Sequence, residues 1–142
     1  MMITPRFMVA VLFAFACSSA SAGVWIEMSR NDDYAAYADP STIRRDGDLV
    51  KMWSMFDYKK PQPGPGGKPY LSTRRHFEYD CKQVRARALG ASLHAVKAGN
   101  GEALIATDAK LGWSKVAPDS ADDFLFRFAC KKETGQATIY GK

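Results

Sequence analysis

Residues 49–58 place the tightest constraint on how this chain can fold. Their odd positions include the apolar side chains of Trp53 and Met55. Their even positions include Met52 and Phe56, so both faces are apolar near the middle of the segment. A strand with one wet face alternates apolar and polar residues, whereas a strand covered on both sides does not. The segment is therefore predicted to be a central strand, and the chain has two sheet faces to cover.

Shorter apolar segments, separated by turn formers, flank this strand. The polar run 30–33 makes a hairpin of the first two segments, and residues 39–42 and 46–47 favour turns. Four prolines interrupt residues 59–69, which argues against ladder pairing and predicts a mobile hairpin loop. A proline-rich recognition segment is the alternative there. The expected strands are 24–29, 34–38, 49–58, 70–79, 84–88 with a less regular continuation to 96, and 103–107.

Residues 118–130 change to the period of a helix. Pro118 opens this segment, Ser120 is placed to cap it, and aspartates follow at its N-terminal end. Apolar residues then recur at helical spacing, which predicts an amphipathic helix of roughly 12 residues. Its apolar stripe must lie on a sheet. The predicted fold class is α+β: an antiparallel sheet of about six strands with one C-terminal helix packed on one face.

The first 22 residues have the pattern of an export signal. Arg6 gives a basic start, residues 7–17 are uninterrupted apolar, and the small residues 20–22 suit a signal peptidase. The apolar run is shorter than the ~20 residues of a membrane-spanning helix. We therefore expect residues 1–22 to be a signal peptide and residues 23–142 to form a single domain without a transmembrane helix.

Cys17 offers a second fate for this leader, because a cysteine after an apolar signal can carry a lipid anchor. The Leu that usually stands three residues before a lipidated cysteine is absent, and cleavage after residue 22 would discard Cys17. A free exported domain is the favoured expectation. Its expected location is the periplasm or the cell surface.

Two cysteines, Cys81 and Cys130, remain after the leader, in a compartment that favours disulfides. We expect them to be bonded to each other, which would fix the end of the helix to the turn at residue 81. Such a bridge stabilises the fold by up to ~4 kcal/mol. The alternative is a reactive thiol pair, but the chain lacks the Cys-x-x-Cys spacing that lowers a thiol pKa.

Charge and residue types argue against several function classes. The formal net charge of +5 is spread through mixed-sign stretches instead of forming one block, so no nucleic-acid partner is expected. The two histidines, His76 and His94, belong to no HExxH or Gly-x-Ser-x-Gly pattern. Both are interpreted as surface or edge residues. We expect no enzyme activity, no metal site and no cofactor.

A basic stripe is the strongest candidate for a binding site. If the strands 70–79 and 84–88 pair as a hairpin, four basic side chains converge on one face, where they can bind an acidic ligand. Glu78 and Asp80 provide the alternative, a solvated face whose charges balance. The candidate ligand-binding residues are Arg74, His76, Arg85 and Arg87.

The central strand suggests a second surface. One helix covers one sheet face, which leaves Trp53 and Met55 on the other face without a partner. A second copy of the chain is the simplest cover, so we expect a homodimer with Trp53 and Met55 at its interface.

Several short motifs, ordinary when taken singly, occur here in a distinctive order and spacing. They are Tyr37-x-Asp39-Pro40-x-Thr42-Ile43-Arg44-Arg45-x-Gly47, Val50-x-Met52-Trp53, Asp57-Tyr58-Lys59-x-Pro61-Gln62, Gly67-x-Pro69-Tyr70-x-Ser72, Tyr79-Asp80-Cys81, and Trp113-x-x-Val116-x-Pro118-x-Ser120 with Cys130. In these motifs the chain resembles the surface-adhesin protein E domain over nearly all of residues 23–142. Asp119 departs from the Gly that is usual between the Pro and the Ser.

The resemblance implies a small exported bacterial domain with an antiparallel sheet, a C-terminal helix, a Cys81–Cys130 disulfide and dimerisation. It also implies adhesion, but no adhesive segment of the family can be matched residue by residue. The leading expectation is a non-enzymatic interaction module for a host matrix protein or an anionic envelope polymer. The rival is a periplasmic small-ligand carrier or enzyme with a pocket beneath the helix. A structural envelope protein is a third interpretation.

Overall fold

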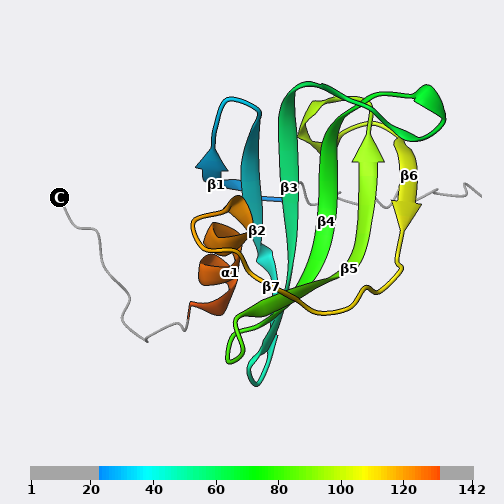
Figure 1. The fold of residues 1–142 in the computed structure, drawn as a ribbon. Coiled ribbons are helices and arrows are strands. Elements are labelled where there is room, and N and C mark those ends of the chain that lie inside the picture. Colours follow the sequence, from blue (N-terminus) through cyan, green and yellow to red (C-terminus); the bar gives the residue numbers. More distant parts are fainter. Residues whose placement is uncertain (1–22, 132–142) are drawn as a thin grey trace, which may run out of the picture.

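The computed structural model, which describes residues 23–131, is a curled antiparallel sheet with one helix against it (Figure 1). The strand order β1-β2-β3-β4-β5-β6 pairs each strand with the next along the chain, and within these residues a seventh strand, β7, pairs with β5. The predicted α+β class is confirmed. The elements are β1 (Ile26–Arg30), β2 (Tyr34–Asp46), β3 (Leu49–Gln62), η1 (Pro65–Gly67), β4 (Tyr70–Asp80), β5 (Arg85–His94), η2 (Lys97–Gly99), β6 (Ala103–Thr107), β7 (Ser114–Lys115) and α1 (Ala121–Cys130), of which η1 and η2 are short 3₁₀ turns.

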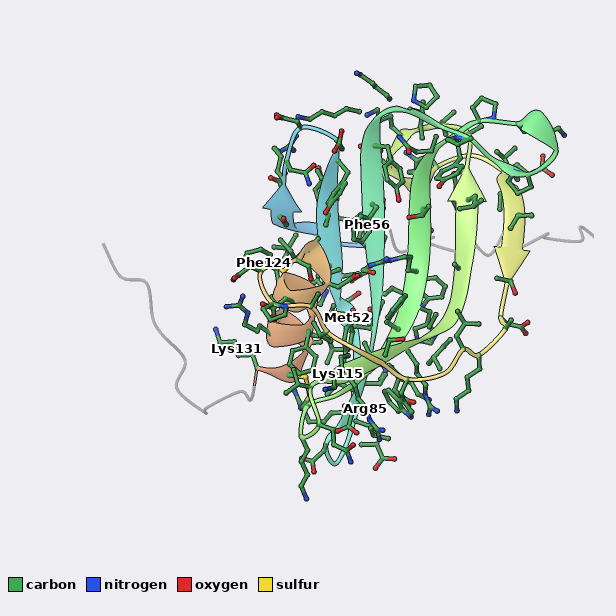
Figure 2. All side chains as sticks on the ribbon, viewed as in Figure 1. Met52, Phe56, Arg85, Lys115, Phe124 and Lys131 are labelled. Carbon is green, nitrogen blue, oxygen red and sulfur yellow. A yellow bond between two sulfur atoms is a disulfide. The ribbon has the colours of Figure 1, made fainter. Side chains whose placement is uncertain are left out.

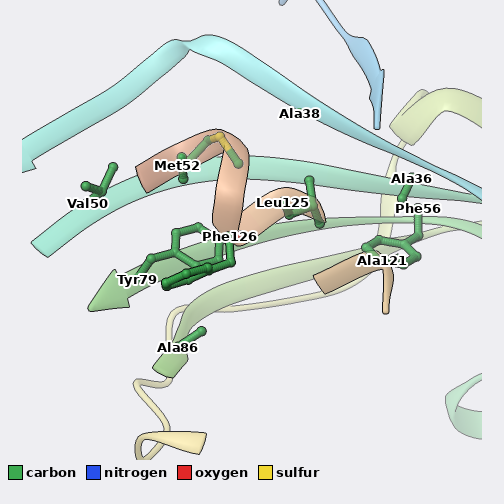
Figure 3. Packing of buried hydrophobic residues seen from close by; sticks show 11 residues of the cluster. Ala36, Ala38, Val50, Met52, Phe56, Tyr79, Ala86, Ala121, Leu125 and Phe126 are labelled. Atoms are coloured by element: carbon green, nitrogen blue, oxygen red, sulfur yellow. The ribbon is translucent and has the colours of Figure 1, made fainter. Parts of the chain in front are cut away.

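The helix α1 lies on one face of the sheet and begins where the sequence predicts. The Oγ of Ser120 accepts a hydrogen bond from the backbone N–H of Asp123 at 3.1 Å, which satisfies a free donor of the first turn. Leu125 and Phe126 point into the sheet, where they meet Met52 and Tyr79 (Figure 3). The buried cluster consists of Ala36, Ala38, Val50, Met52, Phe56, Tyr79, Ala86, Ala121, Leu125, Phe126 and Ala129.

Two connections hold the far end of α1. Cys130 forms a disulfide with Cys81 in the turn after β4, with their Cα atoms 5.5 Å apart, so the predicted pairing is confirmed. Arg45 donates from Nη2 to the carbonyl oxygen of Ala129 at 3.0 Å, which supplies a donor to the otherwise free end of the helix. The predicted signal peptide, residues 1–22, and Cys17 within it lie outside the described residues, as do residues 132–142.

The turn-forming residues 39–42 predicted a reversal of the chain, which the structure does not have there. They lie inside β2, where the register with β3 shifts between Asp39 and Arg44. The Oδ1 of Asp39 accepts a hydrogen bond from the N–H of Ser41 at 3.0 Å, and the Oγ1 of Thr42 accepts one from the N–H of Trp53 at 3.0 Å. Side chains thus replace ladder bonds across an irregular stretch, which makes a bulge within a long strand.

The proline-rich segment also pairs further than predicted. β3 extends to Gln62, which pairs with Tyr70 after a register shift that follows Asp57. Pro61 is tolerated because it lies beyond the regular ladder, near the end of the strand. β7 was not predicted, since two residues are too few to show any alternation.

The face opposite α1 is partly covered by the chain itself. η2 packs against β3 and β4 on this face. The N–H of Ala98 donates to Oδ1 of Asp57 at 3.0 Å, and the N–H of Gly99 donates to Oγ of Ser72 at 2.8 Å. Met55 is only 3% exposed, so it offers little apolar surface to a second copy. Of the two residues predicted for a dimer face, Trp53 stays partly exposed.

Candidate functional site

The four residues of the basic stripe do lie on one sheet face, opposite α1, but the strand register divides them. A bulge between His76 and Phe77 separates two halves of the β4–β5 ladder. We call the part that contains Glu78 and Asp80 the charged half, and the part around Arg74 the open half. The cross-strand pairs are Asp80 with Arg85 and Glu78 with Arg87 in the charged half, then His76 with Gly90 and Arg74 with Ser92 in the open half.

The charged half is internally neutralised. Arg87 donates from Nε to Oε1 of Glu78 at 2.7 Å, and Arg85 donates from Nε to Oδ2 of Asp80 at 3.0 Å. Both acids are buried, at 5% and 6% exposure. Burial pushes the pKa of Asp80 upward, but hydrogen bonds from the Gln83 N–H and from Arg85 outweigh it and leave the pKa below its ordinary value. The charged half therefore corresponds to the alternative expected from the sequence, a face whose charges balance.

An aromatic ring holds the two arginines of the charged half in place. The guanidinium carbons of Arg85 and Arg87 lie 4.7 and 4.2 Å from the centre of the Trp113 ring, within cation–π distance. Arg85 stands at the lower end of the sheet, where it pairs across the strands with Lys115 (Figure 2). With acids on one side and an indole on the other, these arginines have little charge left for an external ligand.

The open half contains a cavity of about 400 Å³. Its floor is formed by side chains of β2, β3, β4 and β5, and residues 23–25 form one wall. Cavities of this size accommodate small ligands. The lining residues are Gly23, Trp25, Asp39, Thr42, Trp53, Arg74, Ser92 and His94.

Arg74 differs from Arg85 and Arg87, the two arginines of the charged half. Among residues 23–131 it makes no hydrogen bond or ion pair, and its Nε is buried without a partner. Its guanidinium carbon lies 5.8 Å from the centre of the Trp25 ring. On the other side, a Cβ placed on Gly99 would collide with its Nε, so the side chain lies directly against η2. Arg74 therefore brings to the cavity a cation that forms no direct ion pair with an acid among residues 23–131.

His76 and Trp53 form the edge of the open half. Their rings are parallel within 4° and their centres are 4.8 Å apart. Burial lowers the pKa of His76 first, the nearby charge of Lys51 lowers it further, and Glu78 opposes the shift. His76 is thus a neutral stacking partner at neutral pH, whereas the sequence suggested a basic group.

His94 is not the surface or edge residue that the sequence indicated. It is 6% exposed, at the end of β5. Its Nε2 shares a hydrogen bond of 2.8 Å with Oγ of Ser92, while its Nδ1 is buried without a partner. Nothing in its sequence neighbourhood could have revealed this burial, because its cover comes from other segments of the chain.

Trp25 and Asp39 were also missed as site residues. Trp25 precedes β1 in irregular chain, where no periodicity assigns it to a face. Asp39 was interpreted as a turn former, yet the β2 bulge keeps it on the cavity side, at 5% exposure. The motif that could have marked it is the spacing of Asp39 and Thr42, because the Oγ1 of Thr42 donates to the main-chain carbonyl of Asp39 at 2.7 Å within the bulge.

A smaller cavity, of about 190 Å³, lies beneath the N-terminal end of α1 between Tyr79, Ala86 and Ser120. This is where the rival carrier hypothesis placed its pocket. Arg75 closes part of the region by pairing with Asp122. Among residues 23–131, no three or more His, Cys, Asp or Glu side chains gather as a metal site. In the same range, no helix is long and apolar enough to span a membrane.

These features place the chain among small α+β domains stabilised by one disulfide. Residues 25–131 match the family model of the surface-adhesin protein E, and the chain belongs to this family. The resemblance seen in the motifs is thereby confirmed. No curated protein matches the sequence.

Solved structures of Haemophilus influenzae protein E are similar in fold. One has 18% identity and a TM-score of 0.58, and the similarity covers 75% of this chain and 83% of that protein. Crystal form II of the same protein has 14% identity and a TM-score of 0.55, with 78% and 96% covered. The structure from a non-typeable strain has 18% identity and a TM-score of 0.52, with 68% and 67% covered. At these identities the likeness concerns the fold alone.

Proposed function

We propose that this chain is an exported, non-enzymatic interaction module that adheres to a host matrix protein or an anionic envelope polymer. The observation that carries the proposal is the asymmetry of the basic face. Arg85 and Arg87 are neutralised, whereas Arg74 lies at the rim of a cavity with no described acidic partner. An unpaired guanidinium beside aromatic rings suits the capture of anionic groups. Membership of the surface-adhesin protein E family supports the same assignment.

The arrangement of polar groups argues against catalysis. Ser92 and His94 form the one nucleophile-and-base pair that we find in the cavity, at 2.8 Å. An active pair of this type has a third group that orients the base, but Nδ1 of His94 has no hydrogen-bond partner. A binding role accounts for both residues without a reaction.

One observation favours the rival carrier hypothesis, although the pocket was expected beneath the helix and not on the opposite face. The 400 Å³ cavity opposite α1 is larger than the one beneath the helix. A carrier would take up a soluble small molecule and ignore polymers, whereas an adhesin retains polymers through the same cavity. The two hypotheses therefore differ in what the purified domain binds.

The test is binding of purified residues 23–142 to immobilised lipopolysaccharide and to immobilised basement-membrane extract, measured by biolayer interferometry at low and physiological salt. We expect salt-sensitive binding to at least one surface, and Arg74→Ala should weaken it about tenfold. The matched control is Arg127→Ala, which removes the same charge from an exposed side chain of α1 and should leave binding unaltered. Absence of binding to both surfaces, or equal loss in both variants, would refute the proposal.

We also propose a homodimer, located in the periplasm or on the cell surface. Trp53 is the residue of the expected dimer face that can contribute to an interface, since Met55 is covered within one chain. Sedimentation equilibrium at micromolar concentration should give the mass of two chains, and Trp53→Ala should shift it towards one. A single-chain mass for the unaltered protein contradicts the dimer, and fractionation of cells distinguishes the two locations.

A further inference from the structure

We propose that the cavity of the open half binds an acidic monosaccharide unit, a pyranose ring that bears a carboxylate. Arg74 is its anion site, and Trp25 and Trp53 are its apolar walls. This inference rests on the proposed adhesive function, because it names the chemical group that the same cavity takes from a polymer. Three properties of the cavity point to this ligand class.

The first is the uncompensated charge of Arg74. The side chain lies between Trp25 and η2, and it forms no ion pair with an acid among residues 23–131. A guanidinium that has no carboxylate partner keeps its charge available to an anion that enters the cavity. A planar guanidinium pairs with a carboxylate through two parallel hydrogen bonds, so it selects this group by geometry as well as charge.

The second is the pair of indole rings. Trp25 and Trp53 both line the cavity, and His76 stacks behind Trp53 in a parallel arrangement that fixes the plane of the ring. The C–H groups on a pyranose face carry partial positive charge and pack on the negative face of an aromatic ring. Simple anions such as phosphate or sulfate have no apolar face and leave both indoles unused.

The third is the acceptor on the opposite side of the cavity. Oδ1 of Asp39 accepts from the N–H and Oγ of Ser41, whereas Oδ2, which lies against Gly23, makes no hydrogen bond with a described residue. β2 and β4 are two strands apart, about 10 Å, so a ligand between Asp39 and Arg74 needs different chemistry at its two ends. A second negative group would be repelled by Asp39, but a hydroxyl would donate to it.

The same side of the cavity argues against a free amino acid. An ammonium group needs three acceptors. Thr42 Oγ1 is already engaged, as it donates to the carbonyl of Asp39 and accepts from the N–H of Trp53. A hydroxyl needs a single acceptor there. A ring with one carboxylate and several hydroxyls thus fits the guanidinium of Arg74 at one end of the cavity and the carboxylate of Asp39 at the other.

The chain provides an internal reporter for a test by NMR. It has three tryptophans, Trp25, Trp53 and Trp113, whose indole N–H signals can be assigned by single Trp→Phe variants. Trp25 and Trp53 line the cavity, whereas Trp113 lies under the arginines of the charged half. Millimolar glucuronate is titrated into residues 23–142, with glucose, acetate and phenylalanine as comparison ligands.

We expect glucuronate to shift the signals of Trp25 and Trp53 but not that of Trp113. Glucose should bind about tenfold more weakly, and Arg74→Ala should reduce the glucuronate affinity to that of glucose. Arg127→Ala should change neither. Since Arg74 has no described bond to lose, its variant is expected to fold, and an unchanged spectrum elsewhere verifies this.

Two results would overturn the inference. One is no glucuronate response at Trp25 and Trp53; the other is an equal response to acetate or phenylalanine. If either occurs while the domain still binds lipopolysaccharide or basement-membrane extract through Arg74, the proposed function stands and the sugar assignment fails. If polymer binding is absent as well, both fail.

Discussion

The imidazole of His76 lies parallel to the indole of Trp53, with 4.8 Å between ring centres and 4° between ring planes. Their contact joins β3 and β4 at the boundary between the open and the charged half of one sheet face. Burial and the charge of Lys51 hold the pKa of His76 below its ordinary value of 6.5. The stack is therefore built with a neutral ring.

A pH dependence of stability follows from this contact. The unfolded chain binds a proton on His76 at a higher pH than the folded chain does, so the folded state is favoured above pH 6.5 and loses this advantage as the pH falls. The urea midpoint should decrease on acidification, and the decrease should be smaller in His76→Phe, which keeps a ring on Trp53 without titrating. An identical pH dependence in both proteins would exclude His76 as the cause.

The ion pair between Glu78 and Arg87 should be costly to break from one side. Glu78 is 5% exposed, so Arg87→Met leaves a buried carboxylate whose next cation, Lys51, is 4.0 Å away and exposed. We expect the free energy of unfolding to fall by about 3 kcal/mol. Glu78→Gln combined with Arg87→Met should lose less than Arg87→Met alone, because no charge then stays buried. Additive losses in urea titrations would show that the pair is not coupled.

The disulfide should contribute strongly to stability through the unfolded state. It joins residues separated by 49 positions, and closing such a loop is worth about 4 kcal/mol in the chain-entropy description. Cys81→Ser combined with Cys130→Ser should therefore lower the free energy of unfolding by up to that amount. Reduction of the unaltered protein should give the same urea midpoint as the double variant. A double variant as stable as the oxidised protein would assign no stabilising role to the bond.

The features that were predictable from sequence are those fixed by local periodicity. The capping residue Ser120 and the apolar spacing after it predict α1. The alternation of β4 places Arg74 and His76 on one face of the strand and Phe77 and Tyr79 on the other. Both predictions are confirmed because they depend only on residues that are neighbours in the sequence. The partner of Cys81 was predictable because a single other cysteine follows the predicted signal peptide.

The cavity escaped prediction because its residues come from separate strands and from irregular chain. Asp39, Trp53, Arg74 and His94 meet through the register of four strands, and the bulges in β2 and in the β4–β5 ladder shift that register. Alternation within one strand says nothing about such shifts. Nor does it show that Met55 is buried on the face opposite α1, or that Arg87 and Arg85 pair with Glu78 and Asp80 instead of a ligand.

Gly99 provides a way to disturb Arg74 without altering it. Gly99 has φ of 61°, a backbone conformation that favours glycine, and any Cβ there would collide with Nε of Arg74. Gly101 has a similar φ of 69°, but its Cβ would meet only Cγ2 of Val96, at 3.3 Å. Gly99→Ala and Gly101→Ala are thus a matched pair. Each is expected to cost about 1 kcal/mol of stability through backbone strain.

The two variants should differ in binding. Gly99→Ala displaces the guanidinium of Arg74 from the cavity and should weaken retention on the anionic surface about tenfold, as Arg74→Ala does. Gly101→Ala should bind like the unaltered protein. Urea titration establishes that the pair is equally destabilised, and interferometry then compares their affinities. Equal affinities at equal stability would mean that the position of Arg74 against η2 does not determine binding, and the cavity would lose its anion site.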